Sequence, residues 1–103
     1  MAELVVTLDL DGVTDKAGLM DRCVDALQLP GWFGRNWDAL ADSLSDTSVW
    51  PGEAGDGLLV VVRNWQSYAK VRPQEWEVAR EVFSAAMDRL PALTVALALG
   101  GTS

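Results

Sequence analysis

The sequence contains no histidine and a single cysteine, Cys23, among its 103 residues. Without histidine, the chain lacks the commonest general base and the commonest ligand of transition metals in proteins. A lone cysteine rules out an internal disulfide, and without histidine it cannot form a cysteine–histidine catalytic pair. These absences predict that the protein binds no metal and needs no cofactor.

A phosphate-binding loop is also missing. The glycine-bearing stretch 52–57 has no strand before it and no Lys-Ser or Lys-Thr after it. Asp38 and Asp42 form the carboxylate pair with the most distinctive setting, but a short exposed helix offers no cleft in which the two could act as acid and base. We therefore predict that the protein is not an enzyme.

The start of the sequence, Met1-Ala2-Glu3, shows no basic segment followed by an apolar run, so it predicts no signal peptide. The longest apolar run, 92–99, is interrupted by Thr94 and is far too short to span a bilayer. We expect a cytoplasmic protein that is monomeric when free and has no membrane partner.

The charge of the chain is strongly unbalanced, with 15 acidic and 8 basic residues and a net charge of −7. Nucleic-acid binding requires a cationic surface that displaces counterions from phosphates, so we expect no nucleic-acid partner. A basic protein would instead be attracted to this surface. Solubility accounts for an acidic composition equally well, so charge alone leaves both interpretations open.

Three aliphatic segments separated by helical patterns predict an α/β fold with a three-stranded parallel sheet. They are Leu4–Leu10, Leu58–Val62 and Leu93–Leu99. Continuous aliphatic runs are typical of parallel strands that are covered on both faces. The length and the 50% apolar content favour one domain over residues 1–103.

Two longer helices are expected, one before and one after the central strand in the sequence. The first begins with Thr14 as N-cap and Asp15 in its first turn, and its apolar stripe contains Cys23, which we interpret as a core residue. The full stripe is Met20, Cys23, Val24 and Leu27. The last helix begins near Pro73 and ends before Pro91, and faces the core with Trp76, Ala79, Phe83, Met87 and Leu90.

A short helix between them is the most informative part of the sequence, LPGWFGRNWDALADSL at 29–44. Asn36 is a good N-cap, and apolar residues at i, i+3 and i+7 predict an inward face. Asp38 and Asp42 fall at i and i+4 on a different face, beside Ala41 and Ser45. The inward residues are Trp37, Leu40 and Leu44.

Aromatic residues beside these carboxylates suggest a protein-binding patch, because interface hot spots favour such side chains. The patch consists of Trp32, Phe33, Asn36, Asp38 and Asp42. A second interpretation fits equally well: Trp32 and Phe33 are buried beneath the loop, and the aspartates are ordinary helix residues stabilised by the dipole.

The same segment resembles the barstar family, inhibitors of barnase-type microbial ribonucleases. The resemblance rests on Leu29-Pro30, Trp32-Phe33, Gly34, Asn36, Asp38-Ala39-Leu40, Asp42 and Leu44. It extends to the whole chain through Trp65 and Tyr68 after the central strand and Val82-Phe83 in the last helix. The resemblance implies three parallel strands packed with about four helices.

The resemblance also implies how the chain works, as an intracellular inhibitor that binds a basic secreted ribonuclease one to one. Asp42 matches the aspartate that takes the place of the RNA phosphate, and Asp38 matches a second carboxylate of that site. Trp32 stands where the family usually has tyrosine. Gly34 and Asn36 match loop residues close to the partner.

Some positions depart from the family pattern. Ala41 stands where the family often has tryptophan, and Ala85 and Arg89 stand where two glutamates help binding. The loop from Ser45 to Gly57 looks longer, and Trp50 is the candidate for the family's loop tryptophan. These departures suggest a guanyl-preferring ribonuclease related to barnase or, as the alternative, a barstar-like module for another partner such as a nuclease toxin domain.

Overall fold

The aliphatic segments of the sequence form one parallel sheet. The computed structural model describes residues 3–29, 31, 33, 34, 36–46, 50 and 57–98. Its strands are β1 (Glu3–Asp9), β2 (Gly57–Arg63) and β3 (Leu93–Leu97), in the order β1-β2-β3. Both pairings are parallel, and Val60 in the middle strand lies between Val6 and Val95.

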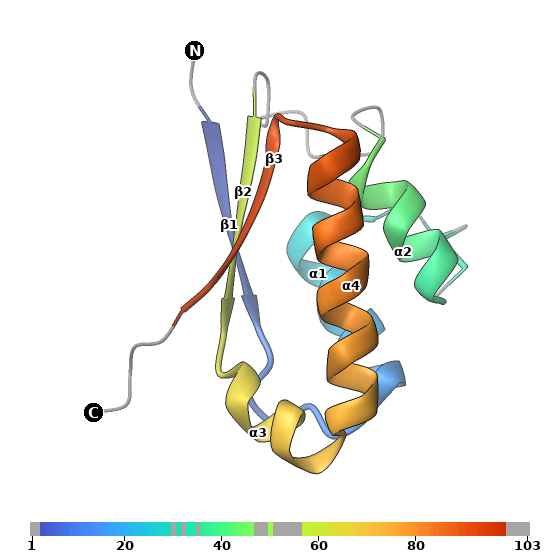
Figure 1. Cartoon of the computed structure of the whole chain (residues 1–103), viewed down its shortest axis with the longest axis vertical. Coiled ribbons are helices and arrows are strands. Elements are labelled where there is room, and N and C mark those ends of the chain that lie inside the picture. The colour runs from blue at the N-terminus through green and yellow to red at the C-terminus, as the bar shows by residue number, and fades with distance from the viewer. Residues whose placement is uncertain are drawn as a thin grey trace.

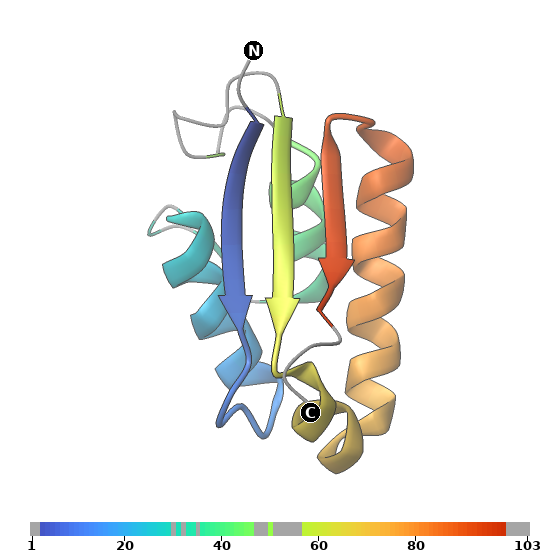
Figure 2. The same ribbon diagram turned by 90° about the vertical axis from the view of Figure 1, so that its left-hand side faces the viewer.

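Among the described residues, four helices connect the strands, two in each crossover. They are α1 (Lys16–Leu27) and α2 (Trp37–Leu44) between β1 and β2, and α3 (Trp65–Val71) and α4 (Pro73–Arg89) between β2 and β3. Figures 1 and 2 show α1, α2 and α4 on the same side of the sheet. The predicted α/β fold with three parallel strands and about four helices is confirmed.

The expectation that the strands are covered on both faces is wrong. The side of the sheet that faces away from α1 and α4 carries no helix in the described part of the chain (Figure 2). Val5 on that side is 57% exposed, whereas Leu8 and Val60 on the helix side are buried. The aliphatic run predicted a strand correctly, but it does not reveal which of its side chains meet a second layer.

The core lies between the sheet and the helices. Cys23 is fully buried there, as predicted from its place in the apolar stripe of α1, and burial raises the pKa of its thiol to about 12. From α4, the predicted residues Trp76, Ala79 and Phe83 are buried, and Met87 is half-buried.

The short helix α3 joins the sheet to α4 through aromatic contacts. Trp65 stacks on Trp76 with ring centroids 5.2 Å apart, and its Nε1 donates to the carbonyl of Ala98 at 3.0 Å. The buried Tyr68 hydroxyl donates to Glu75 Oε1 at 3.0 Å. Trp65 and Tyr68, the aromatic residues that follow the central strand in the sequence, therefore have a structural role at the start of α4.

The element boundaries differ from the predicted ones by one or two residues. Asp15, rather than Thr14, is the N-cap of α1, and its Oδ1 accepts from the backbone N–H of Gly18 at 2.9 Å. The carbonyl of Thr14 instead accepts from Arg72 Nε at 3.0 Å. β3 ends at Leu97, and Leu99, the predicted end, lies outside the described residues.

Candidate partner-binding surface

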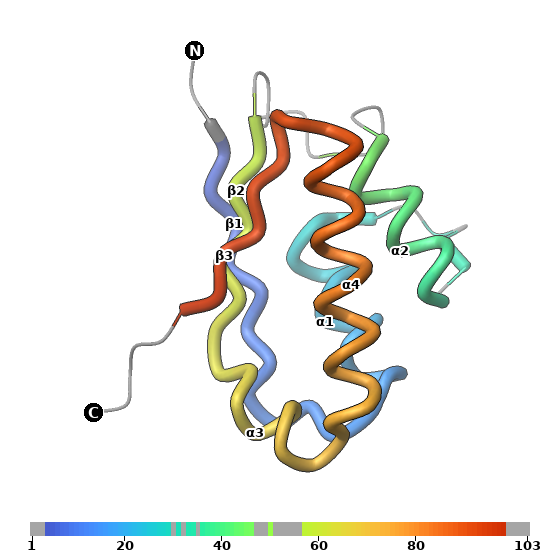
Figure 3. Tube along the Cα trace, viewed as in Figure 1, coloured from blue at the N-terminus to red at the C-terminus, as the bar shows by residue number. Residues whose placement is uncertain are grey.

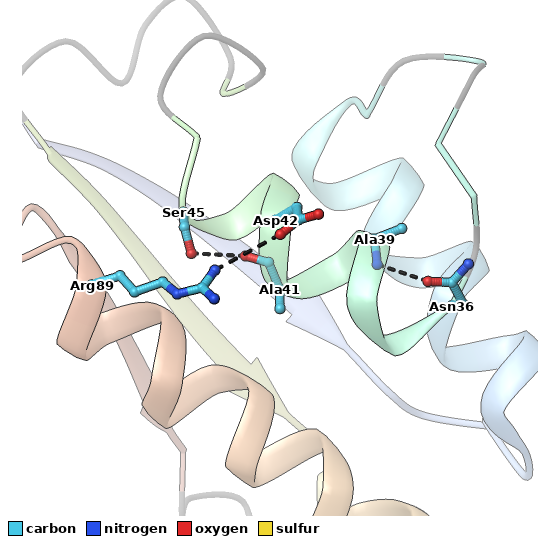
Figure 4. Close-up of polar contacts among 6 residues, drawn as sticks. All are labelled: Asn36, Ala39, Ala41, Asp42, Ser45 and Arg89. Atoms are coloured by element: carbon cyan, nitrogen blue, oxygen red, sulfur yellow. Dashed lines mark hydrogen bonds and ion pairs between the residues drawn. The ribbon is translucent and has the colours of Figure 1, made fainter.

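The helix α2 begins at a side-chain cap. Asn36 lies at φ −136° and ψ 172°, and its Oδ1 accepts from the backbone N–H of Ala39 at 2.7 Å. The Asn36 amide also donates to the carbonyl of Gly34 at 3.3 Å. The cap predicted for Asn36 is therefore confirmed, and one side chain links the preceding loop to the first turn of α2 (Figure 4).

The inner face of α2 is anchored in the core. Leu40 and Leu44 are buried, Ser43 is buried beside them, and Trp37 is half-buried against the core. The inward face predicted from the spacing is confirmed. In Figures 1 and 3, α2 lies farther from the sheet than α4, so its outer face points away from the body of the molecule.

The outer face of α2 carries two carboxylates. Asp38 and Asp42 are both exposed, and the side chain of Asp42 is 81% exposed. They lie one helical turn apart and therefore on the same face. Within the described part of the chain, Asp38 has no hydrogen bond or ion pair, and α2 itself contains no basic residue.

Arg89, the last residue of α4, reaches this face from outside α2. Its Nη1 lies 3.8 Å from Asp42 Oδ1, and Figure 4 shows the guanidinium extending from α4 towards α2. In the sequence, Arg89 is a departure from the family pattern, but its contact with Asp42 was not predicted. No local signal predicts it, because the two residues belong to different elements.

Phe33 and Trp50 are not exposed. Phe33 is 6% exposed and belongs to the core, which agrees with the interpretation that buries it and not with the one that places it on an exposed patch. Trp50 is 8% exposed, and its Nε1 donates to the carbonyl of Leu44 at 3.1 Å. Both side chains hold the chain around α2 in place, while Trp32 lies outside the described residues.

Gly34 and Ala41 complete the predicted set. Gly34 is exposed, and a Cβ there would lie 3.1 Å from Asn36 Nδ2, so a larger residue would press on the capping side chain. Ala41 is half-buried, and its carbonyl accepts from the Ser45 hydroxyl at 2.8 Å, which closes the last turn of α2. Ala41 directly precedes the exposed Asp42, and Gly34 lies in the loop before the helix that carries Asp38.

The described residues offer no group of histidine, cysteine and carboxylate side chains that would hold a metal ion. Within the same ranges, no helix is long and apolar enough to cross a membrane. The outer face of α2 can accept hydrogen bonds and attract cations, because its titratable groups are the two carboxylates.

A family model described as Barstar (barnase inhibitor) matches residues 3–99 of the chain. The chain belongs to the barstar family. The resemblance noted in the sequence is thus confirmed over nearly the whole chain. No curated protein matches it closely enough to count as a relative. Barstar proteins are inhibitors by description, so the family indicates an inhibitor-like protein with a ribonuclease as partner.

Proposed function

We propose that this barstar-family chain inhibits a basic microbial ribonuclease by binding it one to one and covering its active site with α2 and the loop before α2. The inhibitor would act inside the cell that makes the ribonuclease. The observation that carries the proposal is the exposed pair Asp38 and Asp42 on a helix whose opposite face is buried. A rigid helix presents carboxylates in a fixed arrangement, which favours tight binding.

The chemistry of the two surfaces is complementary. A ribonuclease holds the phosphate of RNA with cationic side chains, and a carboxylate forms charge-assisted hydrogen bonds with the same groups. In this proposal Asp42 takes the place of the phosphate, and Asp38 contacts a neighbouring cation. The net charge of −7 would also steer a basic partner towards the chain.

The test is an inhibition titration with barnase, the enzyme that the family description names. We expect an equimolar endpoint, slower association at higher salt and no RNA cleavage by the chain alone, with or without divalent metals. Removing one member of a desolvated charge cluster typically costs about 2–5 kcal/mol. Asp42→Ala should therefore weaken inhibition by at least about thirtyfold, mainly through faster dissociation.

Glu77→Ala is the matched control. Glu77 is an exposed carboxylate on α4 that is paired with Arg80 at 3.6 Å, much as Asp42 is paired with Arg89. Its removal changes the net charge by the same amount and should change affinity little. Equal and modest losses from both variants would show that only net charge matters. No loss from either would place the binding surface elsewhere and contradict the proposal.

A further inference from the structure

The ion pair between Asp42 and Arg89 joins α2 to the end of α4. The two charged atoms are 3.8 Å apart, and the side chains are 81% and 59% exposed, respectively. An exposed pair at this separation contributes little to stability, because solvent screens it and both side chains lose freedom. The importance of Arg89 is therefore electrostatic: it places a cation beside Asp42, the second of the two α2 carboxylates (Figure 4).

The charge of Arg89 affects binding when a partner covers Asp42. A group that binds the Asp42 carboxylate comes within a few ångströms of the Arg89 guanidinium, because the guanidinium already lies against that carboxylate. Water is excluded from such a contact, so charge interactions within it become stronger. A partner that offers only cations there meets a like charge, which is costly, whereas a partner with a neighbouring carboxylate satisfies both residues.

We propose that Arg89 is a specificity-determining residue of this surface, which selects partners that place an acidic group next to the cations facing Asp42. It selects against partners whose site is wholly cationic. The inference rests on the proposed function, since it concerns which ribonuclease the α2 surface accepts.

The experiment measures inhibition of barnase by the wild-type chain, Arg89→Gln and Arg89→Glu. If barnase presents a wholly cationic site to Asp42, affinity should rise in that order, with a total gain of about tenfold or more for Arg89→Glu. A second arm uses barnase variants in which each lysine or arginine bordering the active site is replaced in turn by glutamate. At least one of them should bind the wild-type chain more tightly, and Arg89→Glu less tightly, than unmodified barnase does.

Arg80→Gln and Arg80→Glu are the matched controls. Arg80 also lies on α4, is 54% exposed and is paired with a carboxylate at 3.6 Å. It lies nine positions before Arg89 in α4, which at about 3.6 residues per turn places it on the opposite side of the helix. These variants change the net charge equally and should raise barnase affinity far less.

Each outcome decides the inference. If the Arg89 and Arg80 variants behave alike while Asp42→Ala still abolishes tight binding, the proposed function stands and Arg89 has no role in selection. The same holds if no barnase variant shows the opposite responses of the wild-type chain and Arg89→Glu. If the wild-type chain and all variants, Arg89→Glu included, leave barnase and a set of related guanyl-preferring ribonucleases fully active, the proposed function and the inference both fail.

Discussion

The β1–α1 region and the helix α2 use their polar side chains in opposite ways. In the first, Asp9 accepts from Asn64 Nδ2 at 2.8 Å and from the backbone N–H of Asp11 at 2.9 Å. Arg22 donates to the carbonyls of Asp9 and Asp11 at 2.8 and 2.7 Å. In α2, Asp42 has a long and exposed contact with Arg89.

This difference separates side chains that build the fold from side chains that remain available to a partner. Hydrogen bonds to Asp9 and Asp15 satisfy backbone and side-chain donors within the chain. The oxygens of Asp38 and Asp42 face solvent and can be desolvated by another protein without breaking the fold. Changes in the β1–α1 region should therefore alter stability, and changes on the outer face of α2 should alter binding.

The largest expected effect is an alkaline loss of stability caused by Cys23. Burial raises the pKa of its thiol to about 12, so the folded chain keeps a proton that the unfolded chain releases near pH 8.5. Stability must then fall as the pH rises, by about 2–3 kcal/mol between about pH 9 and pH 11. Urea unfolding across this range measures it, and Cys23→Ala should give a flatter curve.

Burial also raises the pKa of Tyr68, aided by its hydrogen bond to Glu75, so the Cys23→Ala curve should retain some alkaline slope. Parallel curves for the wild-type chain and Cys23→Ala would contradict the assignment of the slope to the thiol.

At neutral pH, Cys23→Ser tests the same region without titration. A hydroxyl in a fully buried apolar site should lower the free energy of unfolding by about 1–3 kcal/mol. Inhibition by the folded protein should be unchanged, because the residue lies inside α1, away from α2. Weaker inhibition at unchanged stability would contradict the assignment of Cys23 to the fold and of α2 to binding.

Asp15→Ala and Asp42→Ala compare one aspartate from each region directly. Loss of the N-cap of α1 should cost about 1 kcal/mol of stability and leave inhibition intact. Asp42→Ala should change stability by no more than about 0.5 kcal/mol. Thermal or urea unfolding measures both, and Asp15→Asn, which keeps a capping oxygen, should restore most of the loss. Equal stability losses would argue that Asp42 also serves the fold.

The smallest effect concerns Asp9 and appears in acid. The hydrogen bond from Asn64, followed by that from the Asp11 backbone, lowers the pKa of the Asp9 carboxyl. Its contribution to stability is therefore present above about pH 4 and is lost as the pH falls through the lowered pKa. Asp9→Asn should be slightly less stable than the wild-type chain at pH 7 and equally stable near pH 2. A difference in stability between the two proteins that persists near pH 2 would show that it does not come from the ionised Asp9 carboxylate.

Local patterns were sufficient wherever a residue's role depends on its neighbours along the chain. Asn36 caps α2 because a side-chain oxygen there reaches the N–H three residues later. Pro73 starts α4 because an N–H in the first turn would have no acceptor within the helix, so the N–H that proline lacks is not missed there. The N-cap of α1 was misplaced by one residue, since Thr14 and Asp15 are both good caps and the contact with Arg72 is distant in sequence.

The amino-acid sequence by itself determined the three strands, the inner face of α2, the burial of Cys23 and the family, because helical and strand periodicities and short motifs are local. Tertiary packing alone decided that no helix in the described ranges covers one face of the sheet, that Phe33 and Trp50 are buried, and that Arg89 lies beside Asp42. An aliphatic or aromatic residue is compatible with either environment, and an ion pair between two helices forms only after they pack. The charge pattern of the proposed binding surface is for that reason a property of the folded chain.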